Sequence, residues 1–166
     1  MSVDMRVSAK ADYAIRAVAE LAAAEGTGQL RADRIADAQE IPIKFLESIL
    51  LELKHAGIVR SQRGAEGGYA LGRPGTDISL ADVIRAVDGP LANVRGDRPE
   101  NVKYKGSAAH LTDVWIAVRA NLRAVLESTS VADLARGELP DSVTKLSTDP
   151  DNWVSLGRIR GVGKGA

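Results

Sequence analysis

Three polar side chains are spaced so that one helix would present them on a single surface. They are Lys44, Glu47 and Ser48, which fall within the first two turns of a predicted helix. Lysine can donate hydrogen bonds to guanine, glutamate can accept one from cytosine, and serine can do either. The three side chains could also form an ordinary solvated face, so their types alone leave both interpretations open.

A second candidate group lies in the glycine-rich segment at residues 63–68. Arg63 stands ahead of Gly64, Gly67 and Gly68 in this segment. Glycines let a backbone approach a phosphate closely, and the narrow minor groove of DNA attracts arginine. In isolation, the segment could equally be a tight turn between two strands.

The elements around these residues follow the order helix, turn, helix and hairpin. Helices are predicted at residues 8–25, 33–39 and 43–56, with strands at 58–62 and 69–71. Ser8 is a favourable N-cap, Pro42 stands at the start of the third helix, and Gly57 ends that helix. The core-facing side of the third helix is expected to comprise Phe45, Leu46, Ile49, Leu50 and Leu53. This order predicts a winged helix-turn-helix, whose recognition helix enters the major groove.

The second half of the chain is predicted to contain three more helices. Ser79 and Asp82 have capping-box spacing ahead of a helix that ends at Gly89. A polar loop without periodicity is predicted at 91–109, a long helix at 110–128 and a short helix at 130–139. The sequence therefore predicts a mainly α fold with a small β-hairpin and a long C-terminal dimerisation helix.

Three regions follow from this division of the chain. We expect a winged helix-turn-helix DNA-binding domain at 1–75, an effector and dimerisation region at 76–139, and a disordered tail at 140–166. The tail is polar and rich in Gly, Asp and Ser, and Trp153 is its only large apolar anchor.

The composition narrows the function classes. The 166 residues include 22 basic and 22 acidic side chains but no cysteine, which excludes disulfides, thiolate nucleophiles and cysteine-ligated metal sites. The zero net charge argues weakly against a nucleic-acid partner, although a local basic surface would be sufficient. No apolar run is long enough for a membrane span, and the first residues do not resemble a secretory signal. We expect a cytoplasmic protein with no membrane association.

An enzyme is the first alternative class. His55 and His110 are the only imidazoles, and their predicted places near helix ends suit solvated residues better than catalytic bases. The glycine-rich string at 161–165 hints at a phosphate-binding loop. It lacks an earlier glycine, a hydroxyl residue after the lysine, and a following helix. We therefore expect no catalysis, no cofactor and no metal ion.

Residues 8–89 resemble the Rrf2 family of winged-helix transcription regulators. The most specific match is the string S-x-R-G-x-x-G-G-Y at 61–69. The other matching segments are 8–14, 41–47, 53–59 and 78–90. The long helix and the segment around Asp133 resemble the family more weakly, and the chain after residue 140 is outside the resemblance.

Together, the pattern and the resemblance imply a homodimeric repressor on a partly palindromic operator in double-stranded DNA. The residues assigned to DNA contact are Ser8, Lys10, Tyr13, Pro42, Lys44, Phe45, Glu47, Ser48, Ser61, Arg63, Gly64, Gly67, Gly68 and Tyr69. Those assigned to the dimer helix are Leu111, Val114, Trp115, Val118, Leu122 and Val125. The alternative function is a winged-helix interaction module whose main partner is a protein, such as a metabolic enzyme.

The signal that such a regulator senses is less constrained. Many family members bind an iron–sulfur cluster through three cysteines between the positions that match Gly89 and Trp115, and this chain has no cysteine. The cysteine-free pattern is closer to the CymR-like branch, which implies a protein partner. A small anionic effector is a second candidate, because the 91–109 loop carries Arg95, Arg98, Lys103 and Lys105 against Asp97 and Glu100. The same charges could simply keep an exposed loop soluble.

Overall fold

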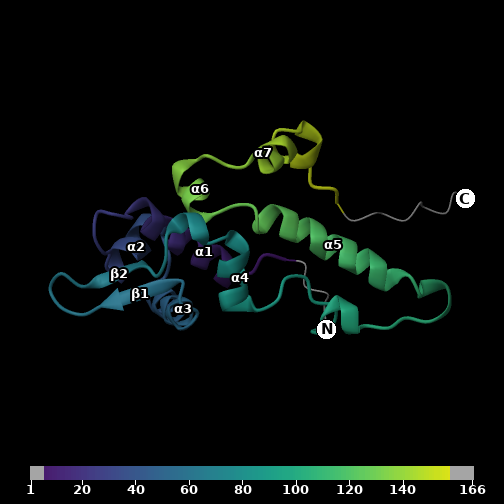
Figure 1. The fold of residues 1–166 in the computed structure, drawn as a ribbon, viewed down its shortest axis with the longest axis horizontal. Coiled ribbons are helices and arrows are strands. Elements are labelled where there is room, and N and C mark those ends of the chain that lie inside the picture. Colours follow the sequence, from purple (N-terminus) through teal and green to yellow (C-terminus); the bar gives the residue numbers. More distant parts are fainter. Residues whose placement is uncertain (1–5, 158–166) are drawn as a thin grey trace, which may run out of the picture.

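The computed structural model describes residues 6–157 and consists of helices around one small antiparallel sheet (Figure 1). The α-helices are α1 (Ala9–Ala23), α2 (Ala32–Gln39), α3 (Ile43–His55), α4 (Leu80–Asp88), α5 (Leu111–Leu126), α6 (Val131–Arg136) and α7 (Asp141–Ser147). The strands are β1 (Val59–Gln62) and β2 (Gly68–Leu71). Short 3₁₀ turns are η1 (Gly75–Asp77), η2 (Pro99–Asn101), η3 (Gly106–Ala108) and η4 (Pro150–Trp153). The predicted fold class, mainly α with one hairpin, is confirmed.

The core is built around α1, whose inner face carries small side chains. Ser8 caps this helix by accepting a hydrogen bond from the amide of Ala11. Ala11, Ala14 and Ala17 are buried. Because alanine side chains are short, α3, α4 and α6 can all pack closely against this helix.

The hairpin is joined to the helical part by an additional backbone pairing. β1 and β2 pair in antiparallel register, with Val59 opposite Leu71. Beyond β2, the amide of Leu30 donates to the carbonyl of Tyr69 at 2.8 Å, and the amide of Tyr69 donates to the carbonyl of Leu30 at 2.7 Å. These two hydrogen bonds fix the hairpin to the segment between α1 and α2.

Helices α4 and α6 begin in the same way and are joined at their N-termini. The hydroxyl of Ser79 accepts a hydrogen bond from the amide of Asp82, and the Asp82 carboxylate accepts one from the amide of Ser79. Ser130 and Asp133 form the same reciprocal pair at the start of α6. The predicted capping box at Ser79 is present, and a backbone bridge joins Ser79 to Ser130. Buried residues of both helices belong to the same core cluster as α1 and α3. The core therefore continues past residue 75, where the sequence suggested a boundary.

Helix α5 lies apart from this core and runs away from the winged-helix part (Figure 1). None of its residues is buried within the described part of the chain. Although it has 16 residues, neither it nor any other helix within residues 6–157 is long and apolar enough to cross a membrane.

The segment at 91–109 is more ordered than the expected polar loop. It contains two short 3₁₀ turns, η2 and η3, and its apolar side chains face inward. The buried residues are Leu91, Val94, Pro99 and Val102. Thr112 of α5 also donates a hydrogen bond to the carbonyl of Val102 at 2.8 Å, so the segment is tied to the helix that follows it.

The expectation of a disordered tail is wrong for the part that the structure describes. Pro140 occupies the N-cap position of α7, and proline is common at the start of helices. The 3₁₀ turn η4 follows α7. The Trp153 indole donates to the carbonyl of Ser147 at 2.6 Å, and Asn152 donates to the carbonyl of Leu146 at 2.9 Å, so both satisfy carbonyls at the end of α7. Trp153 is nevertheless exposed. Residues 158–166 of the expected tail lie outside the described residues.

The pairing of the hairpin with the helical part depends on the missing side chain at residue 68. Gly68 has a φ of +148°, and a Cβ there would lie 2.6 Å from the carbonyl oxygen of Leu30. We expect Gly68→Ala to lower the free energy of unfolding by roughly 1–3 kcal/mol, because the backbone must shift and the Leu30–Tyr69 pairing weakens. Urea unfolding measures the loss.

Gly64→Ala is the matched control for this change. Gly64 also has a positive φ, +109°, but nothing lies within 4 Å of its Cβ position. The control therefore carries backbone strain without a clash. Equal losses of stability in the two variants would contradict the importance of the close approach at residue 68.

Candidate nucleic-acid interface

The polar face of α3 predicted from the sequence is exposed. The buried stripe of this helix comprises Leu46, Ile49, Leu50 and Leu53. Lys44, Glu47 and Ser48 lie on the remaining surface and are all exposed. Because the buried stripe fixes the rotation of α3 about its axis, it also fixes the direction in which these three side chains project.

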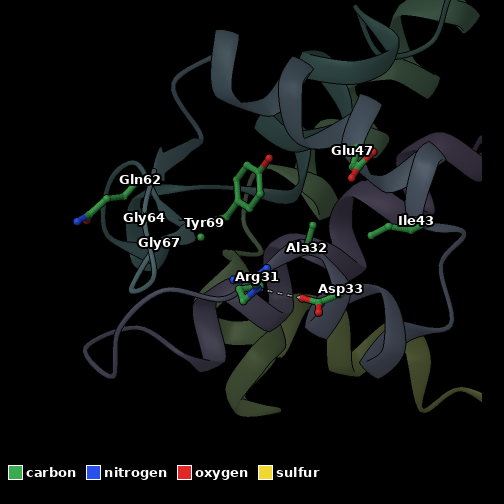
Figure 2. A pocket seen from close by; sticks show the side chains of 10 residues that line it. Arg31, Ala32, Asp33, Ile43, Glu47, Gln62, Gly64, Gly67 and Tyr69 are labelled. Carbon is green, nitrogen blue, oxygen red and sulfur yellow. Dashed lines mark ion pairs between the residues drawn. The ribbon is translucent and has the colours of Figure 1, made fainter.

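An open groove of about 380 Å³ lies between the wing (residues 59–71), the start of α2 and the first half of α3. Its lining, here called the wing groove, comprises Arg31, Ala32, Asp33, Ile43, Glu47, Gln62, Gly64, Gly67, Gly68 and Tyr69. Figure 2 shows the Tyr69 ring between the wing glycines on one side and Glu47 and Ile43 on the other. The structure thus brings Glu47, Gly64, Gly67, Gly68 and Tyr69, five of the residues singled out from the sequence, to one groove.

Phe45 is not a core residue, which corrects the sequence-based expectation. The residue is 38% exposed, and its ring packs edge to face with the Tyr13 ring at a centroid distance of 5.5 Å. The Arg16 guanidinium lies 5.2 Å from the centroid of the Tyr13 ring. Phe45 precedes Leu46 by one position, about 100° around the helix, so it lies at the margin of the buried stripe.

Two of the predicted contact residues bind partners within the chain. Lys10 Nζ lies 2.7 Å from Glu52 Oε1, which links α1 to α3. Ser8 donates a hydrogen bond to the Asp88 carboxylate at 2.5 Å, in addition to capping α1. A phosphate contact by Lys10 would therefore have to share or replace an existing ion pair.

Three further predicted contact residues, Pro42, Ser61 and Arg63, are exposed. Pro42 occupies the N-cap position of α3, and Ser61 lies opposite Tyr69 in the sheet. Arg63 lies in the turn of the wing.

Arg31 lines the wing groove at the N-cap of α2, although the sequence pattern did not indicate it. A signal for it was available, since the first helix of a helix-turn-helix crosses the DNA backbone and a cation at its start suits a phosphate.

The turn between α2 and α3 is held in place by α1. Glu40 adopts a left-handed backbone conformation, with a φ of 53°, at the end of α2. Arg16 donates to the backbone carbonyl of Gln39 and, at 3.2 Å, to its side-chain oxygen. Gln39 in turn donates to Glu20 at 2.5 Å. These contacts fix the angle between the two helices of the helix-turn-helix.

The stripe predicted for the dimer helix is only partly covered within one chain. Leu111, Trp115, Val118, Leu122 and Val125 are half-buried, and Val114 is 51% exposed. Trp115 donates its indole N–H to the Tyr104 hydroxyl at 3.0 Å. The apolar face of α5 therefore keeps uncovered surface along most of its length.

The two histidines do not form a site together. His55 is exposed in the last turn of α3. The His110 side chain, ahead of α5, is 94% exposed and lies 3.4 Å from Asp113. The glycine-rich string at 161–165 lies outside the described residues.

Comparison with known proteins places this architecture among transcription regulators. The family model Rrf2, described as "Iron-dependent Transcriptional regulator", matches residues 7–137. The "Putative HTH-type transcriptional regulator Rv1287" of Mycobacterium tuberculosis is 52% identical over 145 residues, which cover 87% of this chain and 90% of that protein. The HTH-type transcriptional regulator CymR of Bacillus subtilis is 34% identical, over 79% of this chain and 90% of that protein.

Solved structures agree with the sequence comparison. CymR (YrzC), the global cysteine regulator of B. subtilis, superimposes with a TM-score of 0.69 at 33% identity, over 80% of this chain and 97% of that one. IscR of T. potens superimposes with a TM-score of 0.66 at 32% identity, over 80% of this chain and 87% of that one.

The family description refers to iron, but the residues of this chain do not fit an iron–sulfur cluster. The chain has no cysteine, and residues 6–157 contain no group of three or more His, Asp or Glu side chains that could hold a metal ion. Hydrogen bonds from Asn101 and from the amide of Arg98 lower the pKa of Asp97. A hydrogen bond from its own amide and one from Arg119 lower the pKa of Glu100. Both carboxylates are thus stabilised as anions by groups within the chain.

The exposed cation of the wing provides a direct test of the interface. We expect Arg63→Ala to weaken operator binding by roughly 1–3 kcal/mol, because the variant removes a charge-assisted contact to a base or phosphate. The melting temperature should not change, since Arg63 is exposed. Mobility shift measures the affinity, and Arg136→Ala, which removes an exposed cation at the end of α6, is the control. An Arg63→Ala affinity equal to that of the control would remove the wing from the interface.

Proposed function

This chain belongs to the Rrf2 family of transcriptional regulators, and on that premise we propose that it binds operator DNA as a homodimer and represses the adjacent genes. In each half-site, α3 lies in the major groove with Lys44, Glu47 and Ser48 towards the base edges. Arg63 reaches the phosphates or the adjacent minor groove from the wing. A dimer that covers its operator excludes other proteins from the same DNA.

The observation that carries this proposal is the wing groove. Glu47 on α3 and Gly64 on the wing border the same open surface, although the two come from different elements. Its lining is mostly polar side chains and glycine backbone, which suits base edges better than an apolar protein partner. For this reason, DNA is favoured over a protein as the main ligand of the winged helix.

The homodimer is supported by the surface of α5. This helix has no buried residue within the described chain, yet its stripe of large apolar side chains continues for four turns. Burial of such a stripe against a second copy would remove it from water without any other partner. A two-fold dimer also places two α3 helices in successive major grooves, which matches a partly palindromic operator.

A single charged substitution tests the dimer. Val118→Glu places a carboxylate in the stripe, and we expect it to convert a dimer into a monomer at micromolar concentration because a buried unpaired charge is costly. Ala120→Glu is the matched control, since residue 120 lies about 200° around the helix from residue 118. Sedimentation measures the mass, and circular dichroism checks that both variants fold. A dimeric, folded Val118→Glu protein would assign the interface to another surface.

The base-reading role of Glu47 has its own test. A carboxylate near phosphates is repelled unless it accepts a hydrogen bond from cytosine, so Glu47→Ala should relax the preference at one position per half-site with little loss of total affinity. Selection of bound fragments from genomic DNA, with the wild-type and variant proteins, measures this preference. An unchanged selected sequence would make Glu47 part of a solvated face.

The same selection separates DNA from a protein partner. Binding to the selected fragments should weaken steeply between low and moderate salt, because each phosphate contact releases counterions. Failure of the wild-type protein to enrich any fragment at low salt would favour the protein-interaction alternative.

A further inference from the structure

Four arginines from three separate segments converge on one cavity at the junction of α4 and α5. The cavity has a volume of about 350 Å³ and is bordered by Arg85 of α4, Arg98 of the 91–109 segment, and Arg119 and Arg123 of α5. Glu100 is the one carboxylate in its lining, and the rest is backbone, Leu91 and prolines. Like charges repel, so their convergence in the free chain needs an explanation.

The carboxylates that contact these arginines neutralise only part of the charge. Glu100 pairs with Arg119, and Glu127 lies 2.5 Å from Arg85 and 3.9 Å from Arg123. The Arg98 side chain donates no hydrogen bond to any residue within 6–157. Four guanidinium groups therefore lie near three carboxylates, Glu100, Glu127 and Asp97, whose pKa Arg98 helps to lower, so a net positive charge is left for a ligand.

Burial makes the site more than a solvated patch of charge. The Arg119 side chain is only 14% exposed, and its ion pair with Glu100 holds it at the wall of the cavity. A guanidinium group is a planar fork with several donors, which matches carboxylate and phosphate oxygens better than an ammonium group does. The arrangement is thus partly organised before any ligand arrives, which lowers the cost of binding.

We propose that this cavity, the arginine cavity, binds a small anion that carries phosphate or carboxylate groups. Such a ligand would contact Arg98 and Arg123, and it would bridge α4 to α5 through Arg85 and Arg119. Because α4 belongs to the winged-helix core and α5 carries the proposed dimer stripe, the bound anion would hold the two in one relative position. This consequence for operator affinity depends on the proposed function, whereas the binding itself does not.

The proposed anion site differs from the one that the charges of the 91–109 segment suggested. Of the four cations in the 91–109 segment, only Arg98 lines the cavity, and Arg95, Lys103 and Lys105 do not. Three of the four arginines come instead from helices outside that segment. Arg95 is therefore a suitable control, because it is an exposed arginine three residues from Arg98 and outside the cavity.

Calorimetric titration of the full-length protein tests the proposal. The probes are inorganic phosphate, pyrophosphate, succinate and citrate, each at constant ionic strength. We expect at least one of the multivalent probes to bind with one site per chain. The double variant Arg98→Gln, Arg123→Gln should weaken that binding by roughly tenfold or more, because both lost contacts are charge-assisted hydrogen bonds. Arg95→Gln and Arg63→Ala should bind as the wild type does.

Each outcome has a defined meaning. Binding of phosphate probes alone, or of carboxylate probes alone, supports the site and identifies the ligand chemistry. Absence of binding by all four probes at millimolar concentration would overturn the proposal. Loss of binding in Arg63→Ala with retention in the double variant would also overturn it, since the anion would then occupy the DNA surface. DNA binding is measured separately, by mobility shift without any probe. Failure of the wild-type protein to bind DNA in that experiment would contradict only the proposed function.

Discussion

Two backbone hydrogen bonds between Leu30 and Tyr69 set the position of the wing, and the wing groove depends on them. They draw the hairpin against the segment that leads into α2, so wing glycines and α2 come to border the same surface. Gly68 permits this approach because a Cβ there would strike the Leu30 carbonyl. The two glycines therefore have different roles. Gly68 allows the hairpin to pair with the Leu30 segment, and Gly64 leaves the backbone of the turn exposed.

The parts of the structure that follow from local periodicity could be predicted from the sequence. The stripe of α3 and the capping box at Ser79 depend on residues a few positions apart, and both are present. The apolar side chain of Phe45 predicts a core position, although its angular position on α3 places it at the margin of the stripe. The polar composition of the 91–109 segment and its lack of periodicity predict a loop, yet irregular backbone can still bury its apolar side chains, as Leu91, Val94 and Val102 show.

The sequence alone could not predict which distant residues meet in the folded chain. Arg85 and Arg119 are separated by more than thirty positions, and only the packing of α5 against α4 brings them to one cavity. The same limit applies to Arg31, which reaches the wing groove through the Leu30 pairing. Helix α5 is held near both of its ends, through Thr112 at the start and the bridge between Ser79 and Ser130 after its end.

The position of α6 against α1 limits how this protein can be divided. Many DNA-binding domains can be cut out of their parent chains and fused to other proteins. Here the alanine face of α1 is covered by α4 and α6, and Val131, far along the chain, is fully buried in the cluster that supports α3. A piece ending at residue 75 would expose that face to water and lose part of the support for α3. Helices α1, α3, α4 and α6 thus form one folding unit, and a cut between α3 and α6 would divide it.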